Sequence, residues 1–378
     1  MKAVKTLIAA AAAALVASAA QADIKIGVIL PLTGPSSALG IPAKNQVDLW
    51  PTSIAGEKLQ VTVLDDATDP TNGVRIARRF TTEDKVDLIV GSVATPVGVA
   101  IADVARDTKT PQLALTPIGL PPGADAWSFR MPQSNGVMAH ALVSHMKEKG
   151  IKTVGFLGYT DAYGEQWLDA FKPLAEKAGI KLVGVERFAR TDTSVTGQAL
   201  KLVAAKPDAM LIVASGSGAA MPHKAVVERG FKGPIYQTHG AATKDLMRVG
   251  GKDVEGALVV AGPVIAPGQL PDSNPSKAVA LDFSQKYDAK YGAGTANQFA
   301  GHAYDVTVVL EKAIPIALKS AKPGTPEFRA ALLNAFETMG RTVVAHGVLN
   351  WTKDDHWGYT LDTGVIYKVV NGDWKFEK

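Results

Sequence analysis

The apolar residues of this chain fall into short strand-like runs, each followed by a longer segment with helical periodicity. A first series of strand candidates covers residues 24–30, 59–66, 87–92 and 111–116. A second series covers residues 153–159, 181–188, 209–215, 234–239 and 256–262. Such alternation predicts βαβ units and mostly parallel sheets. Because two series are more than one sheet usually carries, we expect two α/β, Rossmann-like lobes of similar plan.

The C-terminal part follows a different pattern. Two or three helices are expected between Ser276 and Met339, followed by the segment 342–351 and then VIYKVVNGDWKFE, in which Asn371-Gly372 predicts a hairpin turn. Helices like those of the first lobe return after Pro275, so the chain is expected to cross between lobes near 129–132, 262–267 and 343–348. The predicted lobes are residues 23–131 with 265–343, and 132–264 with 344–378, joined by a three-segment hinge.

Residues 1–22 carry two lysines, an apolar stretch and small residues ending in Ala20-Gln21-Ala22, the layout of a cleavable secretory signal peptide. No cysteine is available to carry a lipid, so we expect a mature protein free in the periplasm. Without Lys2 and Lys5, the 40 basic side chains become 38 against 36 acidic ones, a net charge of +2. A nearly neutral surface argues against a nucleic-acid partner.

Ligands of open α/β sheets bind beyond the carboxyl ends of the strands, near helix N-termini. The segments expected at those ends are rich in glycine, proline and small polar residues: 32–40, 91–98, 115–123, 158–164, 214–222 and 237–243. In the second segment, Thr95 followed by Pro96 fits the N-cap and first position of a helix. Such an N-terminus attracts a carboxylate, although Thr95 could equally do no more than cap its helix.

Signatures of catalysis are missing from the sequence. It contains no GxSxG, GxxxxGK[ST] or HExxH motif, and the segment SGSGAAMPHK lacks the third glycine of a dinucleotide loop. We therefore expect neither an enzyme nor a bound cofactor or metal.

Several segments together resemble the periplasmic solute-binding proteins of the branched-chain amino-acid (Leu/Ile/Val) type, which serve ABC importers. They are IKIGVILPLTGPSSALG, GSVATPVGVAIADVARDTKTPQLALTP, GYTDAYGEQW and the first crossing FRMPQSN. The resemblance extends over essentially the whole mature chain. It implies a type I periplasmic binding fold, a ligand enclosed by hinge closure, permease subunits in the inner membrane as partners, and a monomer.

The resemblance also implies a set of ligand-binding residues. In amino-acid binders of this family, a hydroxyl and backbone amides of the second and third loops hold the carboxylate, which corresponds here to Thr95 and to residues 118–120. A tyrosine covers the ligand, and Tyr163 matches it. The full expected set is Leu39, Ala94, Thr95, Thr116, Ile118, Gly119, Leu120, Tyr163, Ser215, Ser217, His239 and Phe299.

One departure from the family pattern concerns amine recognition. The acidic residue that holds the ligand's ammonium corresponds to His239, or to Gly240 if the alignment shifts by one. An ammonium without its carboxylate partner costs about 2–5 kcal/mol. In addition, Leu120 stands where amino-acid binders often have a threonine. The expected ligand is therefore a small carboxylate without an amine, such as an aromatic acid or aromatic 2-keto acid of the benzoate or benzoylformate kind.

Other interpretations remain open at this point. His239 could merely bond a loop carbonyl while recognition lies elsewhere, and the ligand could still be a branched-chain or other neutral amino acid. A ligand-sensing receptor for a signalling partner would use the same hinge motion. A secreted hydrolase is disfavoured because it needs a nucleophile, a base and an orienting partner.

Overall fold

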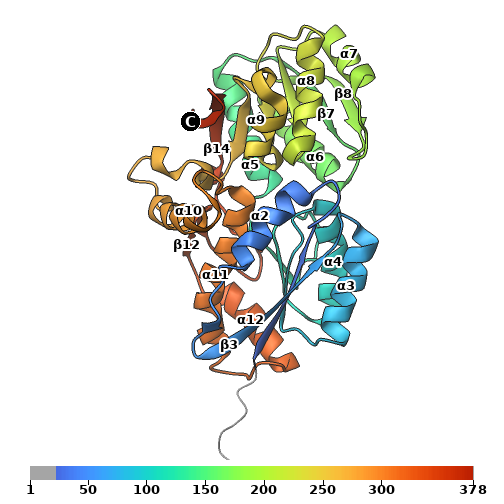
Figure 1. The fold of residues 1–378 in the computed structure, drawn as a ribbon. Coiled ribbons are helices and arrows are strands. Elements are labelled where there is room, and N and C mark those ends of the chain that lie inside the picture. Colours follow the sequence, from blue (N-terminus) through green and yellow to red (C-terminus); the bar gives the residue numbers. More distant parts are fainter. Residues whose placement is uncertain (1–22, 378) are drawn as a thin grey trace, which may run out of the picture.

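The computed structural model describes residues 23–377, so the predicted signal peptide lies outside the described residues. The chain forms two α/β lobes, one above the other in Figure 1, each built on its own sheet. Both sheets are mostly parallel, which confirms the predicted fold class. None of the helices in residues 23–377 combines the length and the hydropathy needed to cross a bilayer.

The first lobe contains a six-stranded sheet in the order β2-β3-β1-β4-β5-β6. Its strands are β1 (Ile24–Leu30), β2 (Ser53–Ile54), β3 (Glu57–Asp65), β4 (Leu88–Gly91), β5 (Gln112–Ala114) and β6 (Ser128–Arg130). Its helices are α2 (Ser37–Val47), α3 (Pro70–Thr82) and α4 (Thr95–Thr108), joined later in the chain by α10 (Lys277–Tyr291), α11 (Gln298–Ala317) and α12 (Pro326–Thr338). In Figure 1 the late helix α11 lies beside the early helix α2.

The second lobe contains a seven-stranded sheet in the order β15-β14-β11-β10-β9-β7-β8. Its strands are β7 (Thr153–Tyr159), β8 (Lys181–Phe188), β9 (Ala209–Val213), β10 (Ile235–Gln237), β11 (Leu258–Ala261), β14 (Val365–Val370) and β15 (Asp373–Phe376). Its α-helices are α5 (Asn135–Glu148), α6 (Ala162–Lys177), α7 (Thr196–Ala204), α8 (Ala220–Glu228) and α9 (Lys244–Gly250). Two short 3-10 helices, η1 (Gly216–Ala219) and η2 (His239–Ala241), follow β9 and β10.

The predicted hairpin at the end of the chain is confirmed. Strands β14 and β15 pair antiparallel, with Val370 opposite Asp373. Asn371 and Gly372 adopt φ values of 53° and 71°. A two-residue turn with two positive φ values matches the twist of the flanking strands, which explains the Asn-Gly pair.

The chain passes between the lobes three times: between β6 and α5, between β11 and the helices α10 to α12, and before β14. Strands β12 (Thr342–Val344) and β13 (Gly347–Leu349) form a separate small hairpin near the last passage. The exact lobe boundaries remain a prediction. Since Leu349, Trp351 and Tyr359 pack in the core of the first lobe, we favour a third crossing after Tyr359, later than the predicted 343–348.

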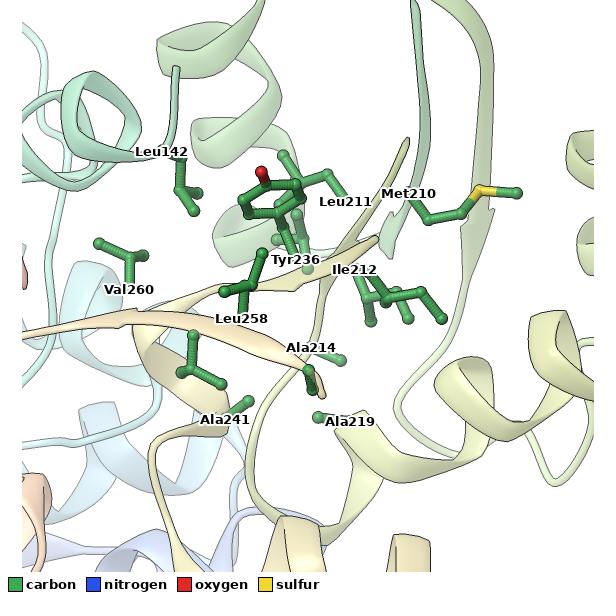
Figure 2. Close-up of a cluster of buried hydrophobic side chains, with 14 of the residues drawn as sticks. Leu142, Met210, Leu211, Ile212, Ala214, Ala219, Tyr236, Ala241, Leu258 and Val260 are labelled. Atoms are coloured by element: carbon green, nitrogen blue, oxygen red, sulfur yellow. The ribbon is translucent and has the colours of Figure 1, made fainter. Parts of the chain in front are cut away.

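The core of the second lobe shows how apolar strands hold the binding loops. Tyr236 of β10 is in register with Leu211 of β9 and Leu258 of β11. These side chains lie on the same side of the sheet as Leu142 of α5, as Figure 2 shows. This packing holds strands β9 and β10 in place, and the loops that follow them begin at the edge of a packed sheet.

Candidate functional site

A small cavity with a free volume of about 20 Å³ lies between the two lobes, at the carboxyl ends of their strands. Such a volume holds about one water molecule, so the two lobes are closed tightly around the cavity. The lining combines apolar walls with hydroxyls, imidazoles and one guanidinium: Leu39, Val93, Thr95, Leu115, Thr116, Pro117, Pro132, Tyr163, Arg190, Ser215, His239, Gly240, Phe299 and His302.

The structure brings together part of the residue set expected from the sequence. The expected residues that line this cavity are Leu39, Thr95, Thr116, Tyr163, Ser215, His239 and Phe299. The expected residues outside its lining are Ala94, Ile118, Gly119, Leu120 and Ser217. Ser217 instead faces a neighbouring surface depression. Direct ligand contact by either group stays a prediction.

Thr95 and Thr116 form a hydroxyl pair in the first lobe. Their Oγ1 atoms are 2.7 Å apart and both side chains are buried. The expectation that Thr95 is the N-cap of its helix is wrong: Ala94 occupies that position, and Thr95 is the first residue of α4. Its hydroxyl pairs with Thr116 because β4 and β5 are neighbours and the two residues follow those strands. Either hydroxyl can be the donor within this pair, which leaves the proton of the other one available.

Backbone groups of the third loop, residues 115–123, are already hydrogen-bonded within the protein. The carbonyl of Ile118 accepts a hydrogen bond from Arg130 Nε at 3.0 Å. The backbone N–H of Gly119 donates to Gln166 Oε1 at 3.0 Å, and Gln166 Nε2 donates back to the Gly119 carbonyl at 3.2 Å. Since Gln166 belongs to α6, this pair of bonds connects the two lobes across the cleft.

Tyr163 is fixed at the start of α6 by its own hydrogen bonds. Its hydroxyl is 2.8 Å from Thr238 Oγ1 and accepts a hydrogen bond from the N–H of Gly240 at 3.1 Å. Burial raises the pKa of the Tyr163 phenol above its usual value, so the ring stays neutral. The tyrosine therefore offers its ring, rather than its hydroxyl, to the cavity.

Arg190 supplies the positive charge of the cavity. Its Nε lies 2.5 Å from Asp161 Oδ2, and its guanidinium stacks 4.1 Å from the ring centroid of Tyr159. Its Nη1 donates to Ser215 Oγ at 2.9 Å and to Ser36 Oγ of the first lobe at 3.5 Å. The ion pair and the stacking hold the guanidinium in place, so an anion entering the cleft would meet a preorganised charge.

His239 has the least satisfied side chain of the site. It is 3% exposed, and neither ring nitrogen has a hydrogen-bond partner. Its ring lies among aromatic neighbours, with the Tyr163 centroid at 5.7 Å and the Trp167 centroid at 5.4 Å. Burial, with a smaller effect of His346, lowers the pKa of His239 to about 3, so the imidazole is neutral near pH 7. Its carbonyl accepts from Gln298 Nε2, at 3.1 Å.

His302 of α11 lies against a buried pair at the hinge. Its ring stacks on His346 at 3.7 Å with an interplanar angle of 16°. Asp305 Oδ2 lies 2.7 Å from His346 Nδ1, and the same carboxylate accepts from the N–H groups of Ala345 and His346. Burial lowers the pKa of His302 well below its usual value, so this imidazole is neutral as well.

The same three residues are the best metal-ligand cluster among residues 23–377, with donor atoms within 4.8 Å of one another. They do not fit a metal site. The Asp305 carboxylate is already engaged by three donors, and stacked imidazole planes direct their lone pairs side by side rather than toward one point. The cluster is better explained as part of the hinge, where Gln133 Nε2 donates to the His346 carbonyl at 2.7 Å.

Two functional candidates were missed by sequence reasoning. Arg190 follows β8 closely, and its position at a strand end was the available signal. His302 is three residues after Phe299 on the same helix, so the two share a helix face. Neither signal is distinctive without knowing which helix and which strand end reach the cleft.

Two α/β lobes, three connections and a cavity lined from both lobes are the architecture of a bilobed receptor for a small molecule. The chain matches the family model of the periplasmic binding proteins over residues 23–363 and belongs to this family. These are solute-binding receptors of ABC type and not enzymes, as the sequence predicted.

The chain is similar to several proteins, three of which illustrate the range. An extracellular ligand-binding receptor from Rhodopseudomonas palustris is 46% identical, with a TM-score of 0.93 over 95% of this chain and 100% of the other. A Leu/Ile/Val-binding protein homolog from Brucella melitensis is 30% identical over 64% of this chain and 68% of its own length. A solute-binding protein from R. palustris in complex with benzoate is 18% identical, with a TM-score of 0.77 over 94% and 95% of the two chains, a likeness that shows the fold alone.

Proposed function

We propose that this protein captures a small organic acid that lacks an amine, with an aromatic or otherwise apolar body, and presents it to an ABC permease by hinge closure. Aromatic acids and aromatic 2-keto acids of the benzoate or benzoylformate kind are the favoured members of this class. The observation that carries the proposal is the charge of the cavity: its lining includes the cation Arg190 and no aspartate or glutamate among the described residues.

A carboxylate has suitable partners on both sides of the cleft. Arg190 and Ser215 approach from the second lobe, and the Thr95–Thr116 pair approaches from the first. Charge-assisted hydrogen bonds of this kind are about twice as strong as neutral ones. The N-terminus of α4 adds a favourable dipole for an anion. These contacts support recognition of the acid group.

An ammonium group has no comparable partner. The nearest carboxylate to the cavity's cation is that of Asp161, which is already paired with Arg190 and caps α6. His239, at the position expected for the acidic residue of amino-acid binders, is neutral and buried. Placing a desolvated ammonium here would cost about 2–5 kcal/mol, which corresponds to roughly 30- to 5,000-fold in affinity.

The apolar body of the ligand would be enclosed by side chains from both lobes. Leu39, Val93, Leu115 and Phe299 come from the first lobe, and the ring of Tyr163 comes from the second. The Gln166–Gly119 hydrogen bonds and the Arg190–Ser36 contact join the lobes in the closed form. Ligand binding would stabilise this closed form, which a permease can recognise.

Isothermal titration of the refolded, ligand-stripped protein tests the proposal with benzoate, benzoylformate, phenylpyruvate, leucine and phenylalanine. We expect binding of one or more acids and at least tenfold weaker binding of the matched amino acid, with phenylpyruvate against phenylalanine as the sharpest pair. Arg190→Gln should abolish acid binding, while Arg187→Gln, an exposed arginine on β8 that pairs with Glu165, is the matched control. Micromolar leucine binding with no response to any acid would refute the proposal.

A further inference from the structure

The end of the cavity nearest the hinge contains two buried imidazoles with unused hydrogen-bonding groups. Both ring nitrogens of His239 are without a partner, and so is Nδ1 of His302. The two side chains are 3% and 1% exposed, and both line the cavity. They come from different lobes, His239 from the loop after β10 and His302 from α11.

Unused polar groups at such depth need an explanation, because buried polar atoms in folded proteins are nearly always hydrogen-bonded. The other buried histidines of the hinge and the second lobe each have at least one hydrogen-bonded ring nitrogen, although Nε2 of His346 has no partner among the described residues. His346 pairs with Asp305, and His223 Nδ1 lies 3.2 Å from Gln237 Nε2. His239 and His302 differ because their rings border the cavity, and His239 has no hydrogen-bonded ring nitrogen at all among the described residues. A ligand that enters the cavity would supply the missing partners.

The groups that surround these imidazoles keep them neutral. Tyr163 and Trp167 of α6 pack against His239, and His346, supported by Asp305, stacks on His302. Arg190 lines the same cavity. No described carboxylate is hydrogen-bonded to either ring. A neutral imidazole has one N–H donor and one acceptor nitrogen.

The imidazole end is separate from the cationic end of the cavity. The Arg190 guanidinium bonds Ser215 at the end of β9, whereas His239 follows the neighbouring strand β10, about 5 Å away at ordinary strand spacing. His302 lies further toward the hinge, on the ring of His346. A ligand whose carboxylate meets Arg190 would therefore extend its opposite end toward the two imidazoles.

We infer that His239 and His302 form a second binding site within the cavity, where both imidazoles hydrogen-bond to a hydroxyl group of the ligand. The solute is then a hydroxylated acid with its carboxylate and its hydroxyl at opposite ends. This inference rests on the proposed function, since it takes the carboxylate to lie at Arg190.

The chemistry of the unused groups selects a hydroxyl among the common oxygen groups. A hydroxyl donates to one imidazole nitrogen and accepts from an N–H of the other ring, so it uses both kinds of group. A keto oxygen only accepts and leaves each acceptor nitrogen unsatisfied. A second carboxylate also only accepts, and it would favour protonated imidazoles, so its binding would draw protons from solution.

The test compares matched ligands by isothermal titration with the full mature protein. The series is 4-hydroxybenzoate, 4-hydroxyphenylacetate and 3-(4-hydroxyphenyl)propionate, each against its parent acid without the hydroxyl and against terephthalate. We expect at least one hydroxy acid to bind about tenfold or more tightly than its parent, because the parent leaves the imidazoles unpaired. Titrations in phosphate and in Tris should give the same enthalpy after correction, which means no net proton uptake.

Two variants assign the preference to the imidazoles. His239→Phe and His302→Phe keep a flat ring and should reduce the preference for the hydroxy acid to less than about threefold, while the parent acid still binds. His223→Gln replaces a buried histidine that lies outside the cavity and should leave the preference unchanged. Circular dichroism verifies folding, and if a phenylalanine variant fails to fold, the ligand comparison in the wild-type protein still decides.

The outcomes separate this inference from the proposed function. Equal affinity for every hydroxy acid and its parent would overturn the inference while leaving acid binding intact. Uptake of about one proton with the hydroxy acid would also overturn it, because the carboxylate would then lie at the imidazoles. Binding of leucine with no acid bound would overturn the proposed function itself.

Discussion

Asp305 is predicted to be the main polar support of the hinge. Its carboxylate is 0% exposed and accepts from Ala345 N at 2.7 Å, His346 N at 3.2 Å and His346 Nδ1 at 2.7 Å. Asp305→Ala would leave these three donors without a partner in a site that water does not reach. A buried donor left without a partner costs about 1–3 kcal/mol, so we expect the loss of three hydrogen bonds to lower the unfolding free energy by about 3–5 kcal/mol.

A second aspartate provides the comparison for burial. Asp288 also accepts from three backbone N–H groups, those of Gly294, Thr295 and Ala296, at 2.7, 3.1 and 2.8 Å. This loop is largely exposed, so water can replace the lost carboxylate. We therefore expect Asp288→Ala to cost only about 0.5–1.5 kcal/mol.

Urea unfolding, followed by circular dichroism and by tryptophan fluorescence, measures both variants against the wild-type protein. If burial strengthens the Asp305 contacts, Asp305→Ala is more destabilising than Asp288→Ala by about 2 kcal/mol or more. If the two variants lose the same free energy, burial does not strengthen the Asp305 contacts and the argument is refuted. Asp305→Asn refines the result, since its amide oxygen can still accept but its NH₂ group faces a donor.

Three further predictions concern packing, closure and pH. Gly27→Ala should destabilise the protein by about 1–3 kcal/mol, because the new Cβ would lie 2.4 Å from a ring carbon of Phe80. Gly197→Ala, in open space on α7, should stabilise it by about 0.5–1 kcal/mol. Urea unfolding midpoints measure both variants, and a change of the same sign in both would contradict the packing argument. Gln166→Ala removes two hydrogen bonds across the cleft, so it should weaken acid binding several-fold and increase the radius of gyration of the ligand-free protein in X-ray scattering. If neither the affinity nor the radius of gyration changes, these hydrogen bonds do not favour closure. Burial lowers the pKa of His223 to about 4, so the unfolded protein binds a proton at this residue at a higher pH than the folded protein does. The stability that His223 contributes above pH 6.5 is therefore lost as the pH falls toward 4. His223→Gln should reduce the loss of unfolding free energy between pH 7 and 4.5 by about 2–3 kcal/mol in urea titrations, and parallel pH profiles of variant and wild type would contradict this assignment.

The sequence predicted the lobes well because their elements carry strong local signals. Strands such as β1 and β7 are mostly apolar runs, and the Asn371-Gly372 turn has a conformation that few other residue pairs favour. The strands β2 and β6, with two and three residues, are too short to show such a signal. β2 pairs with β3 directly after it, and β6 pairs with β5 about fifteen residues before it.

The candidate site was only partly predictable from the sequence. Loops at strand ends were found from position alone, which placed Tyr163 and His239 at the cavity. Arg190 depends on an ion pair with Asp161, a partner twenty-nine residues away in the chain, and His302 depends on α11 returning to the first lobe. From the sequence, the hydroxyl of Thr95 was expected to cap its own helix, but in the structure it is hydrogen-bonded to Thr116 at the end of the neighbouring strand. Such choices among several possible partners are made by tertiary structure.

The buried histidines of this protein show why burial alone does not identify a binding residue. His346 and His239 are both buried, yet Asp305 supports the first and no side chain in residues 23–377 is hydrogen-bonded to the second. A supported imidazole stabilises the fold by itself, so its substitution should affect stability before it affects binding. An unsupported imidazole at a cavity has a cost in the ligand-free protein that a matching ligand can remove. The contrast leads to opposite expectations: removing the imidazole of His239 should preserve stability and alter ligand choice, whereas removing the partner of His346 should destabilise the hinge whatever the ligand.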